Sequence, residues 1–212
     1  DQIIANFPEK DIHEEDDDAI KVAIIGKPNV GKSSLINKIL GEDRLIVSNI
    51  AGTTRDAVDT PIEIDGQKYI FIDTAGMRRK SKIKEEIERF SIIRAVAAVE
   101  RCDVAILLID ANEGVTDQDT KIAGIAHERG KAAIIAVNKW DSIDKDEKTM
   151  NKYLKDISME LKYMEYAPKV FISAMTGQRI NRMLELIQTV YHNHALRIST
   201  GVLNEVLIEA TA

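Results

Sequence analysis

The sequence predicts a doubly wound α/β layer fold, and two observations support this prediction. Six short apolar or alternating segments are expected to form strands, at residues 20–25, 58–64, 68–73, 104–110, 132–138 and 169–173. Segments with helical periodicity alternate with them, at residues 32–40, 85–101, 117–129, 146–162 and 179–193, and a further short helix is expected to start near Gly201. Such alternation is typical of a mostly parallel sheet covered on both faces. We therefore expect a three-layer sandwich around a six-stranded sheet, with the second strand as an antiparallel edge strand.

Length and composition limit the class of protein. The chain has 212 residues, which is enough for one ordinary domain with a full core. No apolar run approaches the ~20 residues needed to cross a bilayer, and no secretory signal is visible at the acidic start of the sequence. The single cysteine, Cys102, cannot form an internal disulfide, which favours a reducing cytoplasm. The net charge of −6 argues against a chain that clamps nucleic acid along its whole length.

The strongest motif is the run GKPNVGKS at residues 26–33, between the first predicted strand and the first predicted helix. Gly26 and Gly31 let the backbone curl so that consecutive N–H groups point at an anion. The helix start adds its positive dipole end, Lys32 can reach the β- and γ-phosphates, and the Ser33 hydroxyl can ligate Mg²⁺. The alternative, a glycine-rich turn with a chance lysine, is disfavoured by the strand before it and the helix after it. The residues predicted to contact the phosphates are Gly26, Pro28, Asn29, Val30, Gly31, Lys32, Ser33 and Ser34.

A second motif selects the base. Asn138, Lys139 and Asp141 directly follow the apolar run at residues 132–137. The Asp141 carboxylate can accept the two adjacent N–H donors of guanine, whereas adenine would leave it unpaired at a cost of about 1–3 kcal/mol or more. Asn138 is expected to brace the pocket, and the Lys139 stem to lie over the base face. Ser173 and Ala174, followed by Met175, end another apolar run and are expected to supply a backbone N–H for the guanine carbonyl.

Two further segments complete the phosphate end. Asp73 follows a strand and is expected near Mg²⁺, and the Gly76 N–H is expected to meet the γ-phosphate. In the polar loop at residues 51–56, Thr54 is preferred over Thr53 as a metal ligand. Since the carboxyl ends of parallel strands form the ligand crevice of such sheets, motifs that follow four different strands should converge on one edge.

These motifs, in this order, resemble those of the translation-factor-related class of P-loop GTPases. The segments GKPNVGKSSL, AGTTRD, DTAGMRRK, NKWD and SA are together similar to those of the Era and MnmE group. Residues 80–111 resemble more closely the second GTPase domain of the Der (EngA) family, whose members act in bacterial ribosome assembly. The resemblance covers the chain from about Ile20 onward. It implies a Ras-like P-loop NTPase fold, with GTP or GDP and Mg²⁺ as ligands.

Domain boundaries follow from composition and from this resemblance. Residues 1–19 carry an acidic block at 14–18 and are interpreted as an interdomain linker. Residues 20–197 hold the nucleotide motifs and are interpreted as the GTPase domain. Der-type proteins have two tandem GTPase domains and a KH-like domain, so residues 198–212 are interpreted as a linker and the truncated start of the KH-like domain. The neighbouring GTPase and KH-like domains are then expected partners.

The expected reaction is hydrolysis of GTP to GDP and phosphate, which depends mainly on placement and charge neutralisation. Many GTPases orient the attacking water with a glutamine after Asp-x-x-Gly, but Met77 occupies that position here. In GTPases that resemble this one, an asparagine at the position of Asn29 helps to hold K⁺ against the phosphates, and an amide oxygen suits such a cation. Alternatively Asn29 only shapes the loop, and Arg55 is a less favoured cationic aid. We expect slow, K⁺-stimulated turnover with these catalytic residues: Lys32, Asn29, Thr54 and Gly76.

The leading hypothesis is a GTP-hydrolysing switch in assembly of the large (50S) ribosomal subunit. A basic cluster beside the nucleotide motifs is either a solvated loop or a nucleotide-controlled contact with ribosomal RNA; it consists of Arg78, Arg79, Lys80, Lys82 and Lys84. No membrane contact is expected. Two alternatives are a GTPase domain of a tRNA-modification protein, as in MnmE, and a guanine-nucleotide-regulated RNA-binding module with little turnover.

Three expectations concern packing. Trp140 should pack beside the base pocket, and Cys102 should be a small packed residue near a helix end. The predicted helix at residues 85–101 should bury a stripe made of Ile87, Phe90, Ile93, Arg94, Val96 and Ala97.

Overall fold

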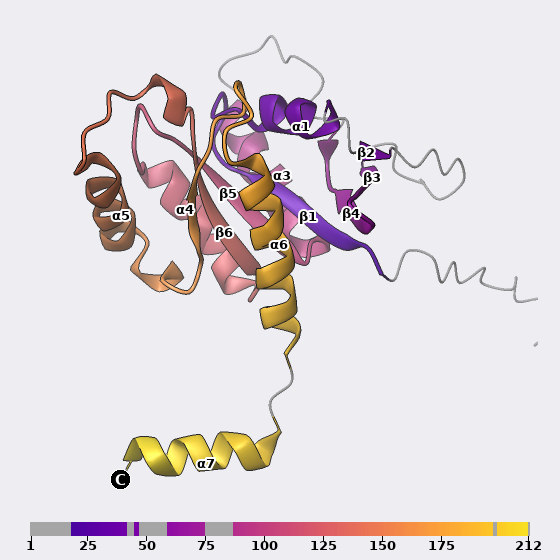
Figure 1. The fold of residues 1–212 in the computed structure, drawn as a ribbon, viewed down its shortest axis with the longest axis vertical. Helices are drawn as coiled ribbons and strands as arrows, with labels where there is room; N and C mark the ends of the chain where they lie inside the picture. The colour runs from indigo at the N-terminus through magenta and orange to yellow at the C-terminus, as the bar shows by residue number, and fades with distance from the viewer. Residues whose placement is uncertain (1–17, 42–44, 47–58, 75–86, 197–198, 212) are drawn as a thin grey trace, which may run out of the picture.

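The protein is built on a seven-stranded sheet with the strand order β2-β3-β4-β1-β5-β6-β7 (Figure 1). The computed structural model describes residues 18–41, 45–46, 59–74, 87–196 and 199–211. The strands are β1 (Ile20–Ile25), β2 (Leu45–Ile46), β3 (Thr60–Ile64), β4 (Gln67–Phe71), β5 (Val104–Asp110), β6 (Ala132–Asn138) and β7 (Lys169–Phe171). β4, β1, β5, β6 and β7 are parallel, whereas β3 is antiparallel to both β4 and β2.

The predicted α/β fold is confirmed, and all six predicted strands are present. The sheet also contains β2, a strand of two residues that the sequence analysis did not predict. Because β2 pairs with β3, the second predicted strand is antiparallel as expected but is not the outermost strand.

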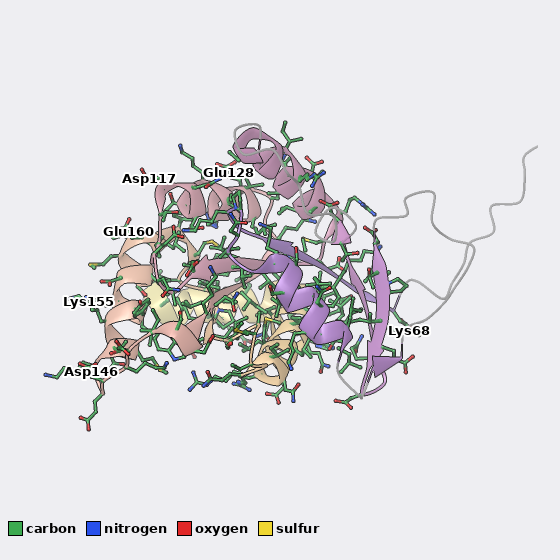
Figure 2. All side chains as sticks on the ribbon, turned by 90° about the horizontal axis from the view of Figure 1, so that it is seen from above. Lys68, Asp117, Glu128, Asp146, Lys155 and Glu160 are labelled. Carbon is green, nitrogen blue, oxygen red and sulfur yellow. The ribbon has the colours of Figure 1, made fainter. Side chains whose placement is uncertain are left out.

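Helices cover both faces of the sheet and give the three predicted layers. They are α1 (Lys32–Leu40), α3 (Ile87–Arg101), α4 (Asp117–Glu128), α5 (Thr149–Glu160), α6 (Ile180–Ala195) and α7 (Thr200–Thr211), with short 3-10 turns η3 (Trp140–Ser142) and η4 (Lys162–Met164). Buried residues of α1 and α6 form one core cluster with the sheet, and those of α3, α4 and α5 form the other. In Figure 2, Lys68 on β4 and Lys155 on α5 lie toward opposite sides of the molecule.

The central strands supply both clusters, because their side chains alternate between the two faces. In β1, Val22 and Ile24 face the α1–α6 side, and Ala23 and Ile25 face the α3–α5 side. Every residue of β5 and of β6 is buried. Continuous apolar burial of this kind is typical of parallel strands covered by helices on both faces.

The expected core stripe of α3 is wrong at three described positions. Ile93 is 63% exposed, and Arg94 and Ala97 are also exposed. The helix instead buries Ala95, Ala98 and Val99, with Cys102 just after its end. This set has the helical spacing i, i+3, i+4 and i+7. Small apolar residues surround much of this helix, so the sequence allowed more than one buried face. The side chains of Ile87 and Phe90 lie outside the described part of the structure.

The first strand and the last helix lie near the predicted domain boundaries. β1 begins at Ile20, which is where the predicted GTPase domain begins, while the acidic residues 1–17 lie outside the described ranges. α7 presents exposed apolar side chains at Leu203, Val206, Leu207 and Ile208. Among the helices that the structure describes, none combines the length and apolar character that a membrane crossing requires.

Candidate functional site at the carboxyl edge of the sheet

Residues of the predicted site follow the carboxyl ends of neighbouring parallel strands. Gly26 directly follows β1, Asp73 lies two positions after the end of β4, Asn138 ends β6, and Ser173 lies two positions after the end of β7. Since β4, β1, β5, β6 and β7 are adjacent and parallel, these positions lie along one edge. The structure therefore brings the phosphate, metal and base motifs together, as the sequence analysis expected.

The phosphate loop between β1 and α1 adopts a strained curl. Gly26 and Gly31 have φ values of 146° and 106°, and Asn29 lies in the left-handed region with φ 61°. A Cβ on Gly26 would lie 2.6 Å from the carbonyl oxygen of Leu108, so this glycine also permits close contact with β5. The N-cap of α1 is Gly31, which has no side chain to cap the helix, and the start of a helix attracts anions through its dipole.

Lys32 is anchored to the loop that precedes it. Its Nζ donates to the carbonyl oxygens of Gly26 and Lys27, both at 2.7 Å. Burial lowers the pKa of Lys32 to about 8, and the nearby Asp119 carboxylate opposes this shift. A largely desolvated ammonium group that donates to two carbonyl oxygens is an attractive partner for an anion.

Asn138 joins the base motif to the phosphate loop. Its Nδ2 donates to the Val30 carbonyl oxygen at 2.8 Å, and its Oδ1 accepts the Ala174 N–H at 2.9 Å. The residue is 2% exposed. A Cβ on Gly31 would lie 2.2 Å from the Asn138 Nδ2. One amide side chain therefore connects two loops, the one at Val30 and the one at Ala174.

The rest of the base motif is shaped by packing and backbone geometry. Lys139 adopts a left-handed conformation with φ 62°, after which η3 begins at Trp140 and leaves Asp141 exposed. Trp140 is buried, with its ring centroid 4.4 Å from that of Phe171 and 5.1 Å from that of Tyr153. The predicted packing role of Trp140 is confirmed.

The loop after β7 differs in one respect from expectation. The Ala174 N–H donates to Asn138, and the Ser173 N–H donates to the carbonyl oxygen of Gln178 at 3.2 Å. Both N–H groups therefore already have partners inside the protein. The sequence analysis had expected one of them to bind the guanine carbonyl and did not predict these partners. Met175, the next residue, is 82% exposed.

Asp73, the predicted metal ligand, lies just after β4 on the same edge of the sheet. Its backbone is in the left-handed region with φ 57°, and its N–H donates to Asp59 Oδ1 at 3.0 Å. Burial raises the pKa of Asp73, whereas Arg94 and Arg101 act in the opposite direction. Ser33 is partly buried at the start of α1. The predicted contributions of Thr54 and Gly76, and those of Met77 and the basic cluster at residues 78–84, lie outside the described residues.

Four residues that the sequence analysis missed support this edge. Lys27 is buried and donates to Glu113 Oε2 at 2.7 Å, with Asp119 Oδ2 at 3.8 Å. Asp110, at the end of β5, accepts Lys139 Nζ at 2.5 Å. One signal was readable, because Thr116 and Asp119 have the spacing of a helix-capping box, and the structure contains that box. The lysine partners of these carboxylates are distant in the sequence, so the local sequence did not indicate them.

Comparison with known proteins gives consistent matches. The model of a family described as "50S ribosome-binding GTPase" matches residues 21–139. Proteins named GTPase Der from Lachnoclostridium phytofermentans and Lachnospira eligens are 61% and 62% identical over 212 residues, which is 100% of this chain and 48% of each relative. The chain thus spans about half the length of the curated relatives that it matches.

Solved structures agree with the fold. A crystal structure of Era in complex with MgGDPNP and nucleotides 1506–1542 of 16S ribosomal RNA has a TM-score of 0.62 and 31% identity, and the match covers 82% of this chain and 57% of that chain. An Aquifex aeolicus Era variant bound to GDP.AlF4⁻ has a TM-score of 0.61 and 32% identity, covering 80% of this chain and 56% of that chain.

Proposed function

The chain belongs to the 50S ribosome-binding GTPase family, and on that premise we propose that it binds guanine nucleotides at the carboxyl edge of its sheet and hydrolyses GTP as a molecular switch. The observation that carries the proposal is the Asn138 clamp, which ties the phosphate loop at Val30 to the base loop at Ala174. Through this clamp, Lys32 and Asp141 belong to one connected site, so a single nucleotide can contact both.

In the proposed complex the phosphates bind the loop and the start of α1. The contacts come from Gly26, Pro28, Asn29, Val30, Gly31, Lys32, Ser33 and Ser34. The base contacts Asn138, Lys139 and Asp141, with Ser173, Ala174 and Met175 at its carbonyl edge. Asp141 supports guanine over adenine because its exposed carboxylate can accept two adjacent donors.

A magnesium site is part of the proposal, and the donor set fits it. The Ser33 hydroxyl and the Asp73 carboxylate are hard oxygen donors, the type that Mg²⁺ prefers. Burial raises the pKa of Asp73, so this carboxyl group gains from a neighbouring cation. We assign Thr54 as a third ligand and Asn29 as a ligand of K⁺. Bound metal would neutralise charge on the phosphates.

The residues of the chain then have distinct tasks in hydrolysis. Lys32 and the loop N–H groups bind the β- and γ-phosphate oxygens, and the Gly76 N–H binds the γ-phosphate. No glutamine is available after Gly76 to orient water, so intrinsic turnover is slow. Asn29 contributes by holding K⁺ beside the phosphates, which gives the reaction its dependence on that ion.

Guanine recognition is tested by replacing Asp141 with asparagine. The amide places a donor opposite the guanine donors, so the affinity for GDP should fall at least about tenfold, the equivalent of one unpaired polar group. Xanthosine diphosphate, which carries a carbonyl where guanine carries its amine, should bind the variant better than GDP. Asp144→Asn, which removes an exposed carboxylate three residues away, is the matched control. Unchanged GDP affinity in Asp141→Asn would contradict the assignment.

Turnover is tested by phosphate release at saturating GTP and Mg²⁺, in K⁺ and in Na⁺. We expect faster release in K⁺, and Asn29→Ala should remove most of the difference. Equal rates in the two salts would refute the K⁺ site. Absence of release in both would favour a binding module that presents its surface to RNA without useful turnover.

The biological role that we propose is assembly of the large ribosomal subunit. It rests on the family match and on relatives named GTPase Der, and the Era structure shows that a related fold binds ribosomal RNA. Because the relatives are about twice as long, we propose that residues 1–19 and 198–212 connect this domain to a second GTPase domain and a KH-like domain. A domain of a tRNA-modification protein is the second candidate. Co-sedimentation with large subunits should depend on whether a GTP analogue or GDP is bound, and no dependence would count against the assembly role.

A further inference from the structure

The segment from the last residue of β5 to the first turn of α4, residues 110–119, carries two buried carboxylates, and each one forms an ion pair with a lysine beside the proposed nucleotide site. We propose that Asp119 and Asp110 are positioning residues: Asp119 fixes the phosphate loop through Lys27, and Asp110 fixes Lys139 for the base. This inference rests on the proposed guanine-nucleotide function. According to this proposal, residues 110–119 position the groups that bind the phosphates and also the group that binds the base.

Hydrogen bonds from Thr116 fix the position of the Asp119 carboxylate beside Lys27. It is fully buried, and its Oδ2 accepts the Thr116 N–H at 3.0 Å and the Thr116 hydroxyl at 2.7 Å within the capping box of α4. The same oxygen lies 3.8 Å from Lys27 Nζ. Its other oxygen, Oδ1, is buried without a hydrogen-bond partner among the described residues. Among the described residues, the charge of this carboxylate is therefore compensated by Lys27, by the cap and by the nearby ammonium group of Lys32.

Lys27 transmits this constraint to the phosphate loop. Its ammonium group donates to Glu113 Oε2, in the connection between β5 and α4, at 2.7 Å and lies 3.8 Å from Asp119 Oδ2 on α4. Its carbonyl oxygen accepts the Lys32 Nζ at 2.7 Å. The backbone of Lys27 is thus fixed on one side by α4 and on the other by the lysine that is proposed to bind the phosphates. A displacement at Lys27 would shift Lys32 and the neighbouring N–H groups together.

Asp110 plays the corresponding role at the base end. Its Oδ2 accepts Lys139 Nζ at 2.5 Å, and its Oδ1 accepts both the backbone N–H and the side-chain Nδ2 of Asn112 at 2.9 and 3.0 Å. Asn112 Nδ2 also donates to the Ser142 hydroxyl, which in turn donates to the Lys139 carbonyl oxygen at 2.7 Å. Lys139 is thereby held at its side chain and at its backbone.

The segment itself is a firm support. The Asp110 carbonyl oxygen accepts the N–H groups of Glu113 and Gly114, and the Tyr153 hydroxyl donates to the Ala111 carbonyl oxygen at 2.6 Å. Hydrogen bonds of this kind at both ends of a short segment keep its geometry fixed, which is what a positioning role requires.

The two placements predict different ligand-binding defects, which GMP and GDP can separate. Asp119→Asn has nearly the same shape and keeps an oxygen for Thr116, but it removes the buried one of the two carboxylate charges that pair with Lys27. We expect GDP affinity to fall about tenfold and GMP affinity to change less than about twofold, because the added phosphate depends on loop placement. Lys27→Met should reproduce this pattern, and the double variant should lose no more than either single variant.

Asp110→Asn should weaken GMP and GDP by the same factor, about fivefold, because both carry the base that Lys139 contacts. The matched control is Asp117→Asn, which removes an exposed carboxylate from the same first turn of α4 (Figure 2) and should change neither affinity. All affinities are measured by equilibrium titration of the 212-residue chain at fixed Mg²⁺, and unfolding curves check the fold of each variant.

The outcomes are distinct. A proportional loss of GMP and GDP in both Asp119→Asn and Lys27→Met would show a general structural role and overturn the positioning role of Asp119. If Asp119→Asn does not fold, Lys27→Met still decides the matter. A defect confined to GDP in Asp110→Asn would overturn its assignment to the base. Failure of the unaltered chain to bind either nucleotide would refute the proposed function instead.

Discussion

Replacing Asn138 with alanine is the sharpest test of how the site is held together. Asn138 is 2% exposed and bonds two backbone groups that belong to different loops, the Val30 carbonyl and the Ala174 N–H. Alanine at this position removes both bonds at once. The buried Val30 carbonyl and the buried Ala174 N–H are then both left without a partner.

The expected loss of stability follows from counting these groups. Leaving a buried polar group without a partner costs about 1–3 kcal/mol, so two such groups cost about 2–6 kcal/mol of the free energy of unfolding. For a domain of this size each kcal/mol lowers the melting temperature by about 2–4 °C, so we expect a decrease of at least about 4 °C. Urea unfolding monitored by circular dichroism should show a lower midpoint with an unchanged m-value.

Asn151→Ala provides the control, because Asn151 is exposed on α5 and its replacement should change stability by less than about 0.5 kcal/mol. A loss below about 1 kcal/mol in Asn138→Ala would refute the reasoning, since even one unpaired group should exceed that value. It would mean that the two loops do not depend on the clamp. In that case the link between the phosphate and base ends of the site would have to lie elsewhere.

Three further outcomes are expected. In Gly31→Ala, the φ of 106° is unfavourable for alanine and the added Cβ would lie 2.2 Å from Asn138 Nδ2. Unfolding curves should therefore show that the free energy of unfolding falls by at least about 1–3 kcal/mol. The decrease should be smaller in the Asn138→Ala background, where the close contact is absent. Trp140→Ala should cost about 3–5 kcal/mol in urea unfolding, whereas Trp140→Phe should cost less because an aromatic contact with Phe171 remains. Burial raises the pKa of Cys102 from 9.0 to about 11, so the unfolded chain loses this proton first and stability should fall as pH rises between those values. Urea midpoints across that range should fall less steeply for Cys102→Ala than for the unaltered chain, and equal slopes would contradict the shift.

The parts of the fold that the sequence predicted are those with strong local signals. The runs at residues 104–110 and 132–138 are apolar throughout, and both proved to be fully buried parallel strands. β2 was missed because two residues carry no periodicity; it exists because Leu45 and Ile46 pair with Ile64 and Glu63 across the sheet. The face of α3 was misassigned because Ile93 suggested burial, whereas the helix packs through smaller residues such as Ala95 and Ala98.

The same distinction holds in the site. Sequence patterns placed Gly26 and Asn138 correctly at strand ends and Lys32 correctly at the start of a helix, since each motif carries its own local context. The contacts that join the motifs were not readable, because Asn138 and Val30 are 108 positions apart and Lys27 and Glu113 are 86 apart. Only the fold shows which carboxylate meets which lysine. The capping-box spacing of Thr116 and Asp119 was a readable signal for the start of α4, but it carries no information that Asp119 also faces Lys27 of the phosphate loop.

These contacts divide the site into two halves with different supports. Lys27, Val30 and Lys139 are tied to β5, β6 and the start of α4, so the phosphate loop and the base loop are fixed before any ligand arrives. A site that is already ordered loses less entropy on binding. Asp73 is instead tied to the β3–β4 hairpin: its N–H donates to Asp59, which is paired with Arg101. Asp73 is therefore supported by the β3–β4 hairpin and α3, and the loops at Val30 and Lys139 are supported by β5, β6 and α4. Under the proposed function, the side that would hold the metal and the side that would hold the diphosphate and base thus depend on separate contacts.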